Sequence, residues 1–197
     1  MTSAHATARR AELFDAVVAL FLADGFAHLT LDEIAGRLRC SKSTLYTLAP
    51  SKDELVVAAV RHFFRAATDA VDAADRTAAS DAGGERVTAR RLAAYLGAVG
   101  EALAPASESF MSDLAAFEPT RLVYERNTAA AAERVRAIVD DGARAGDVRD
   151  VHATFVADVA ASVMVSIQTR ALARRTGLDD ATAYRELADL LTRAVTR

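Results

Sequence analysis

The sequence contains few of the residues that shape secreted, fibrous or β-rich proteins. Its 197 residues include one cysteine, three prolines, nine glycines and no tryptophan. A single cysteine excludes an intrachain disulfide framework, and the low proline and glycine content leaves room mainly for helices. Because 52% of the residues are hydrophobic, the chain can bury a substantial core, which excludes a disordered protein.

The chain also lacks an uninterrupted apolar stretch of about 18 residues and a charged-then-apolar leader. We therefore expect a cytoplasmic protein with no membrane partner. The histidines His5, His28, His62 and His152 are scattered, with no cysteine or carboxylate at metal-ligand spacing, and are expected to be surface or capping residues. Phosphate-binding glycine loops and nucleophile elbows are absent. From the sequence we therefore expect a protein that is not an enzyme and that has no metal site, cofactor or catalytic residue.

The segment from Thr30 to Leu55 is the most informative part of the chain. Thr30 and Glu33 form a capping box, which predicts a short helix from about residue 31. The helical spacing of apolar residues stops after residue 38, and Ser41 is the next natural N-cap. A second short helix follows, and Ser51 caps a third. This pattern of two short helices joined by a tight turn predicts a helix-turn-helix unit that reads DNA.

The second of these helices has the composition expected of a helix that enters the major groove. It combines small hydroxyl side chains, one cation and one aromatic residue, with Leu45 as the only clearly apolar residue. Such a helix needs short donors to phosphates and base edges and little bulk near the duplex. The chain has only two lysines, and both fall in this segment. The predicted DNA-binding residues are Thr30, Ser41, Lys42, Ser43, Thr44, Tyr46, Thr47 and Lys52. The alternative is an ordinary helical hairpin with a polar surface.

Residues 11–55 resemble the N-terminal domain of the tetracycline-repressor (TetR) family of bacterial regulators. The resemblance follows the family's order of features: a first helix over residues 13–21, the pair Gly25-Phe26, the threonine-capped helix with Ile34-Ala35, the reading helix with Thr44-Leu45-Tyr46, and the start Ser51 to Leu55 of the next helix. It implies an N-terminal three-helix DNA-binding domain. It also implies a C-terminal helical domain that pairs with a second copy and encloses an effector pocket.

The sequence departs from the family pattern at two places. Arg39 and Cys40 stand where glycine and a small apolar residue are common, so the turn must place a non-glycine residue at positive φ at some cost. Leu48 and Ala49 replace a frequent histidine-phenylalanine pair, which removes a usual phosphate contact and a packing anchor. We therefore expect DNA affinity to depend mainly on Lys42, Tyr46 and Lys52. Cys40 precedes a helix N-terminus, where a thiolate would be favoured, so the residue could act as a redox switch. The simpler interpretation is that Cys40 serves only as a small residue in the turn.

The rest of the chain also reads as helices, which makes the predicted fold class all-α. The spacing predicts helices over residues 7–23, 51–74, 86–103, 107–117, 119–144, 151–175 and 179–196, with a loop over residues 78–85. Ser107 to Ser109 are interpreted as an N-cap and first turn. We expect two domains, a DNA-binding domain over residues 1–54 and a helical effector-binding and dimerisation domain over residues 55–197.

Two sets of residues are candidates for the functions of the second domain. Apolar stripes along residues 151–175 and 179–196 predict a homodimer interface at Phe155, Val159, Val163, Ile167, Leu187 and Leu191, with a monomeric core as the alternative. Adaptable methionine, aromatic and polar side chains predict a ligand site at Phe110, Met111, Leu114, Phe117, Tyr124, Met164 and Gln168, with plain core as the alternative.

These observations together predict a homodimeric transcriptional regulator, most simply a repressor. Its expected partners are a palindromic double-stranded DNA operator and a small apolar or amphipathic molecule that releases it. A hypothesis from another class is a helical protein-interaction module with a degenerate DNA-reading unit, which the departures at Arg39, Leu48 and Ala49 would explain.

Overall fold

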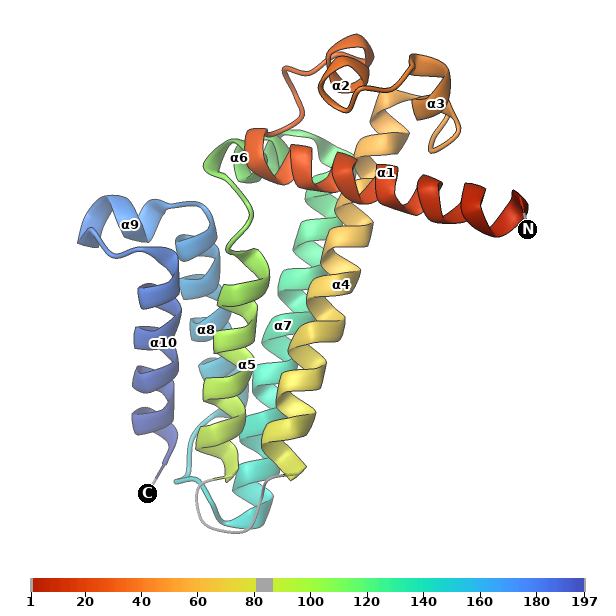
Figure 1. Ribbon diagram of the computed structural model, residues 1–197. Helices are drawn as coiled ribbons and strands as arrows, with labels where there is room; N and C mark the ends of the chain where they lie inside the picture. The colour runs from red at the N-terminus through yellow and green to blue at the C-terminus, as the bar shows by residue number, and fades with distance from the viewer. Residues whose placement is uncertain (1, 81–86, 197) are drawn as a thin grey trace. The chain divides into compact units, whose positions relative to one another are not determined.

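The computed structural model describes residues 2–80 and 87–196, and this part of the chain contains helices and no strand (Figure 1). The prediction of an all-α fold is confirmed. The helices are α1 (Thr2–Asp24), α2 (Leu31–Arg37), α3 (Lys42–Tyr46), α4 (Lys52–Ser80), α5 (Val87–Leu103), α6 (Glu108–Ala116), α7 (Glu118–Ala145), α8 (Ala153–Gln168), α9 (Ala171–Thr176) and α10 (Asp180–Val195).

Side-chain caps begin the helices where the sequence predicts them. The backbone N–H of Glu33 donates to the Thr30 hydroxyl at 3.2 Å, and the Thr30 N–H donates to the Glu33 carboxylate at 2.7 Å, which completes the capping box. Ser41, Ser51 and Ser107 each accept from the N–H three residues later. Each cap satisfies one of the N–H groups that a helix start leaves without an internal partner.

The chain packs as two compact units that do not follow the linear order of the sequence. Unit 1 comprises residues 1–65 and 105–124, and unit 2 comprises residues 66–104 and 125–197. Helices α4 and α7 each contribute to both units. These units reflect packing alone. The predicted boundary between residues 54 and 55 refers to function, so it stays a prediction.

The structure corrects two helix predictions. Residues 151–175 form two helices instead of one, because α8 ends at Gln168 and Arg170 adopts a left-handed conformation with φ 58° before α9. The Thr169 hydroxyl donates to the carbonyl of Val165 at 2.9 Å, a local bond that competes with continued helix. Helix α4 extends to Ser80 instead of residue 74, so residues 78–80 of the predicted loop are helical. Residues 81–85 of that loop lie outside the described residues.

The core of unit 2 lies between α5, α7, α8 and α10. Leu92, Leu96, Ile138, Met164 and Tyr184 are almost completely buried there. Gly100 of α5 makes a close approach of α10 possible, because a Cβ on it would lie 3.1 Å from the Tyr184 ring. Burial of this apolar surface is the main stabilising contribution to unit 2.

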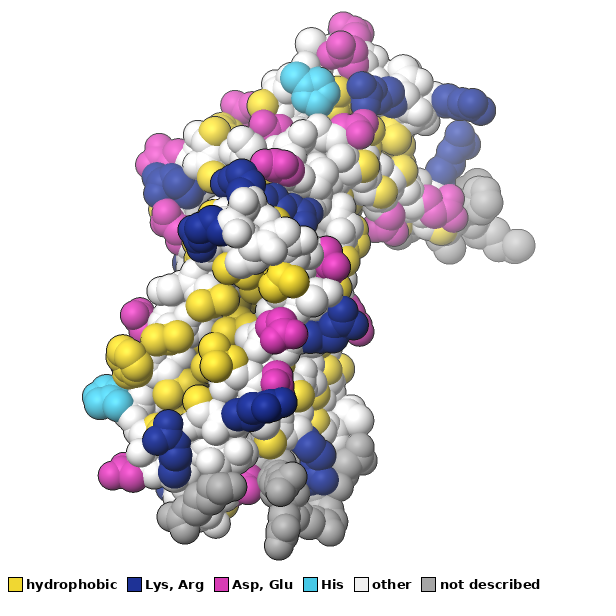
Figure 2. All heavy atoms as spheres, turned by 90° about the vertical axis from the view of Figure 1, so that its left-hand side faces the viewer, with side chains coloured by type: hydrophobic (Ala, Val, Ile, Leu, Met, Phe, Trp, Pro, Cys, Tyr) yellow, Lys and Arg dark blue, Asp and Glu magenta, His cyan; other side chains and the backbone are white. Residues whose placement is uncertain are grey.

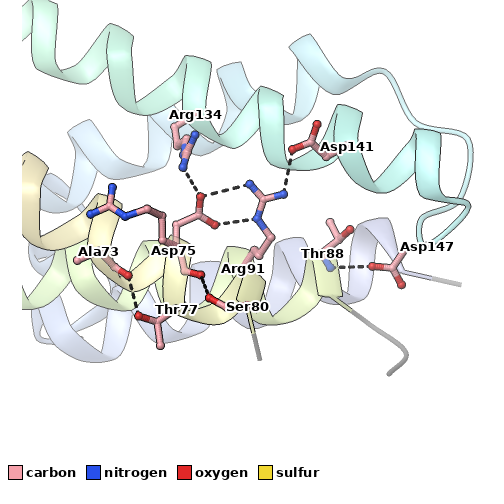
Figure 3. Close-up of polar contacts among 10 residues, drawn as sticks. Ala73, Asp75, Thr77, Ser80, Thr88, Arg91, Arg134, Asp141 and Asp147 are labelled. Atoms are coloured by element: carbon pink, nitrogen blue, oxygen red, sulfur yellow. Dashed lines mark hydrogen bonds and ion pairs between the residues drawn. The ribbon is translucent and has the colours of Figure 1, made fainter. Parts of the chain in front are cut away.

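A network of charged side chains crosses the same unit (Figure 3). Asp75 of α4 is 1% exposed and accepts two hydrogen bonds from Arg91 of α5, at 2.8 and 3.2 Å. Arg134 of α7 pairs with Asp75 as well, and Arg91 also contacts Asp141 at 3.0 Å. Hydrogen bonds to Asp75 and Asp141 raise the pKa of Arg91. The buried carboxylate therefore has two cationic partners, which offset the cost of burying its charge.

Candidate DNA-binding site

Helices α2 and α3 form the predicted helix-turn-helix, and the turn between them is closed by backbone hydrogen bonds. The N–H of Arg39 donates to Gly36 O at 3.2 Å, and the N–H of Cys40 donates to Ala35 O at 2.9 Å. Arg39 has φ 52°, so the predicted non-glycine residue at positive φ is confirmed. An L side chain in this conformation is strained, and the cost is roughly 1–2 kcal/mol. The turn nevertheless keeps its hydrogen bonds.

Few apolar contacts hold α3 in place. Leu45 is its only buried residue, 1% exposed, and Ala49 beyond the helix end is also buried. Ser41, Lys42, Ser43, Tyr46 and Thr47 are exposed, and Thr44 is half-buried. The Ser41 hydroxyl lies 2.7 Å from that of Ser43 and 2.8 Å from that of Thr44. The helix therefore presents a continuous polar face of hydroxyl groups with one cation and one aromatic ring.

Both lysines of the predicted site already have partners within unit 1. Lys42 Nζ donates to Asp32 of α2 at 2.9 Å, and this hydrogen bond raises the pKa of Lys42. Lys52 Nζ donates to the carbonyl oxygen of Ala27 at 3.0 Å. An ammonium group has three donors, so each lysine retains donors for a phosphate. Thr30, by contrast, uses its hydroxyl in the capping box, where it also donates to Glu33 at 2.8 Å.

Two arginines near α3 were not among the predicted DNA-binding residues. Arg10 of α1 is exposed, and its Nε donates to the carbonyl oxygen of Thr47 at 3.1 Å, which places a cation beside the end of α3. Arg39 is exposed in the turn just before α3. The pair Arg9-Arg10 was a visible signal in the sequence, but periodicity alone does not show which end of α1 lies near α3.

The predicted ligand residues divide between the two units. Phe110, Met111, Leu114, Phe117 and Tyr124 belong to unit 1, whereas Met164 and Gln168 belong to unit 2. Phe110 is packed edge-on against Phe26 and Phe63, with ring centroids 6.1 and 5.8 Å away. Phe117 and Tyr124 are half-buried.

In unit 2, the predicted ligand residue Gln168 makes a buried polar contact. Its amide Nε2 donates to the hydroxyl of Tyr184 at 2.9 Å. Met164 is 1% exposed within the surrounding apolar core. Gln168 and Tyr184 thus form a buried polar pair in that core.

Burial also separates the predicted dimer residues into two groups. Ile167, Leu187 and Leu191 are between 1% and 4% exposed inside unit 2, so their side chains are covered by their own chain. These three side chains line the core of unit 2 within the single chain, and their assignment to a dimer interface stays a prediction. Val159 and Val163 are half-buried, and Phe155 is 67% exposed.

An apolar surface nevertheless remains on unit 2. Leu190 of α10, which the prediction omitted, is 61% exposed. Figure 2 shows hydrophobic side chains gathered on the side of unit 2 where α9 and α10 lie in Figure 1. The large exposed apolar residues of α8 and α10 in the described chain are Phe155 and Leu190.

The structure also shows the surroundings of a predicted capping histidine and of the cysteine. His152 caps α8, and its Nδ1 accepts from the N–H of Phe155 at 3.2 Å. Cys40 is a half-buried free thiol in the turn before α3. Within residues 2–80 and 87–196, no group of three or more His, Cys, Asp or Glu side chains is arranged to hold a metal ion. Among the described helices, none is long and apolar enough to cross a membrane.

Comparison with known families identifies the domain built around this site. Residues 13–59 match the model of the family described as bacterial regulatory proteins, tetR family. These residues are a TetR-family DNA-binding domain. The match contains α2, α3 and the start of α4, so the resemblance recognised in the sequence is confirmed. A comparison with curated proteins found no match.

Solved structures show that the TetR-like fold extends over almost the whole chain. A putative transcriptional regulator from Saccharomonospora viridis, solved in complex with choline, is 16% identical with a TM-score of 0.76, and the match covers 97% of this chain and 99% of that one. A TetR transcription regulator from Haloarcula marismortui is 19% identical with a TM-score of 0.70, covering 97% and 100%. The ketosteroid regulator KstR2 of Mycobacterium tuberculosis is 19% identical with a TM-score of 0.62, covering 96% and 95%. The chain therefore has the fold of TetR-family transcriptional regulators.

Proposed function

We propose that this protein is a homodimeric transcriptional repressor that a small apolar or amphipathic molecule releases from its operator. The observation that carries the proposal is the polar face of α3, held in a TetR-family domain by Leu45 and presenting Lys42 and Tyr46 to solvent. A face of this composition suits phosphates and base edges in a major groove. Because chromosomal DNA is the partner, the protein would act in the cytoplasm.

The departures from the family pattern favour DNA reading over a degenerate unit. Arg39 adopts the left-handed conformation that the turn requires, and the turn keeps its backbone hydrogen bonds. Ala49 is buried at 8% exposure, so it occupies a packed position despite its small size. Arg39 also adds a cation next to Ser41 and Lys42. The alternative of a protein-interaction module would require a distorted reading unit, which these contacts do not support.

A homodimer would supply the second reading helix that specific binding needs. Two copies of α3 would contact half-sites about one helical turn of DNA apart, which is why the proposed operator is palindromic. The surface we assign to the second copy comprises the exposed Phe155 and Leu190 with the half-buried Val159 and Val163. Exposed aromatic and aliphatic side chains of this size on neighbouring helices are typical of protein interfaces.

The proposed ligand is a small molecule with an apolar body. Similar regulators support a small-molecule ligand, because the Saccharomonospora protein was solved with the cation choline. The Mycobacterium protein, a ketosteroid regulator, supports the apolar body. Among the predicted ligand residues of unit 1, Phe117 and Tyr124 are half-buried and remain candidate contacts. Helix α4 follows α3 directly and contributes residues to both units. A tilt of α4 on ligand binding would change the spacing of the two reading helices and release the DNA.

Binding of the purified full chain to the DNA upstream of its own gene tests the proposal. We expect a discrete palindromic site to bind much more tightly than a scrambled duplex, by about a thousandfold or more at physiological salt. Footprinting should show protection of two half-sites. Equal affinity for both duplexes, or no binding at all, would contradict the proposal and leave the protein-interaction module as the better explanation.

A further inference from the structure

Helix α6 places a carboxylate against the turn that connects α1 to α2. One oxygen of Asp113 accepts hydrogen bonds from two consecutive backbone N–H groups, that of Phe26 at 2.6 Å and that of Ala27 at 2.8 Å. The two partners are 86 or 87 residues away in sequence. Backbone N–H groups that lie beyond a helix end need a partner outside the helix, and hydrogen bonds to an ionised acceptor are the stronger kind.

The turn is shaped to admit this carboxylate. Gly25 has φ +83°, and a Cβ on it would lie only 2.6 Å from the Asp113 oxygen and 3.1 Å from the Cβ of Ser109. A side chain at this position would therefore collide with α6. The N-cap of α6 is anchored to α1 as well, since the N–H of Ser107 donates to the carbonyl oxygen of Leu22 at 2.8 Å. The hydrogen bonds of Ser107 and Asp113 thus hold α6 against the end of α1 and the turn that follows it.

The turn that Asp113 holds also carries the partner of a DNA-facing lysine. Lys52 Nζ donates to the carbonyl oxygen of Ala27 at 3.0 Å, and the N–H of Ala27 donates to Asp113. Lys52 is the first residue of α4, six positions after the last residue of α3. The backbone of Ala27 therefore joins the Asp113 carboxylate, through its N–H, to the Lys52 ammonium, through its carbonyl oxygen.

We infer that Asp113 is a positioning residue for DNA binding, acting through the turn at residues 25–27 on Lys52. The inference rests on the proposed function. The ammonium of Lys52 spends one of its three donors on Ala27 and can direct the others at a phosphate. Without Asp113, the N–H groups of Phe26 and Ala27 lose their shared partner, so the Ala27 carbonyl oxygen that accepts from Lys52 is held less firmly. No sequence motif marks Asp113, because its partners lie at the opposite end of the domain in sequence.

The test measures operator affinity of the full-length protein at several salt concentrations. Asp113→Ala should weaken binding by roughly tenfold and should reduce the salt slope by up to about one unit per protomer, the amount expected for one lost phosphate contact. Asp113→Asn keeps an oxygen acceptor of the same reach and should restore most of the affinity and slope. A purely structural role of Asp113 would change stability without changing the salt slope.

A double-mutant cycle with Lys52→Ala tests whether Asp113 affects DNA binding through Lys52. If Asp113 acts through Lys52, Asp113→Ala should weaken binding far less in the Lys52→Ala background than in the wild type. Asp189→Ala serves as the matched control, because Asp189 is an exposed acid of α10 in unit 2 that pairs with Arg193. Additive effects of the two substitutions would overturn the assignment.

Two further outcomes are distinguishable. A wild-type protein that binds no DNA would refute the proposed function, whereas a wild type that binds with an Asp113→Ala variant of equal affinity and slope would refute only the inference. If Asp113→Ala does not fold, Asp113→Glu replaces it, because the longer side chain cannot keep both bonds in the space beside Gly25 and Ser109. A folded Asp113→Glu variant with unchanged affinity and slope would equally overturn the inference.

Discussion

The ammonium of Lys42 lies 2.9 Å from the carboxylate of Asp32, so the only lysine of the reading helix is paired with an acid of the preceding helix. Both side chains are largely exposed, and such a pair adds little to stability. Its importance is electrostatic, because the acid lies beside the surface that would face DNA. Asp32 partly neutralises the charge that Lys42 presents to a phosphate.

Asp32→Asn is therefore expected to tighten DNA binding. Removing a carboxylate next to the phosphates relieves repulsion and leaves Lys42 fully available, so affinity should rise severalfold at low salt and less at high salt. Fluorescence anisotropy with operator and scrambled duplexes measures both. Equal gains on both duplexes are expected, since a phosphate contact carries no sequence information. If Asp32→Asn binds DNA more weakly than the wild type, the main effect of Asp32 is to position Lys42 and not to repel the phosphates.

Lys52 and Thr44 should differ in the kind of binding energy they contribute. Lys52→Ala is expected to weaken binding to all sequences alike and to reduce the salt slope by about two units per dimer, one for each lost contact. Thr44→Ala is expected to change the preferred bases with little change in slope, because the hydroxyl of Thr44 lies on the polar face of α3 beside Ser41. Titration of both variants at several salt concentrations separates the two roles. An unchanged slope for Lys52→Ala would remove it from the contact set.

Arg39 offers a case in which stability and function should move in opposite directions. Arg39→Gly relieves the strain of an L residue at φ 52° and should raise the free energy of unfolding by roughly 1 kcal/mol. If the exposed guanidinium contacts DNA, the same variant should bind operator more weakly. Chemical denaturation and DNA titration measure the two effects. Arg39→Ala is the matched control, since alanine loses the charge but keeps most of the strain, and equal stability of the two variants would contradict the strain.

The sequence predicted most of the local structure of unit 1 but little of how distant segments meet. The caps Thr30, Ser41 and Ser51 and the strained turn at Arg39 follow from neighbouring residues, because caps and turns are decided within a few positions of the chain. The contact of Asp113 with Phe26 and Ala27 does not, because it joins segments 86 and 87 residues apart through backbone N–H groups that look the same in any sequence. Spacing alone could not reveal it.

The same limit applies to the predicted interface residues. Helical periodicity shows that Leu187 and Leu191 share an apolar face of α10, but it cannot say whether that face meets the chain's own core or a second copy. Packing decides, and α5 and α8 cover these side chains. The break at Arg170 was missed for a related reason, since no glycine or proline marks it and a non-glycine residue adopts the left-handed conformation there.

The charged network of unit 2 should respond unequally to loss of its acids. Asp75→Ala leaves Arg91 and Arg134 without their shared partner and should cost about 3–5 kcal/mol of unfolding free energy, as expected when one member of a buried ion pair is removed. Asp141→Ala should cost about 1 kcal/mol or less, because the Asp141 side chain is 43% exposed. Urea denaturation of both variants measures the two losses of unfolding free energy. Similar losses would show that the burial of Asp75 does not determine how much it contributes to stability.

Burial also makes a sharp prediction about the second copy. Phe155→Glu places a charge on a side chain that is 67% exposed in the single chain, so the protomer should stay folded. In a dimer that uses this surface, however, the same charge would be buried without a partner at a cost of several kcal/mol, and the dimer should dissociate. Sedimentation velocity measures the state of assembly, and thermal unfolding followed by circular dichroism measures the fold.

Leu187→Glu is the matched comparison, because this side chain is 3% exposed in the core of unit 2. It should unfold the unit whether or not a dimer forms, since a buried charge without a partner destabilises the protomer itself. Leu190→Glu should behave like Phe155→Glu, because Leu190 is 61% exposed on the same helix as Leu187. A folded, still dimeric Phe155→Glu variant would move the interface away from α8. A wild type that sediments as a monomer at all concentrations would rule out the homodimer, and with it a paired arrangement of the two reading helices on a palindrome.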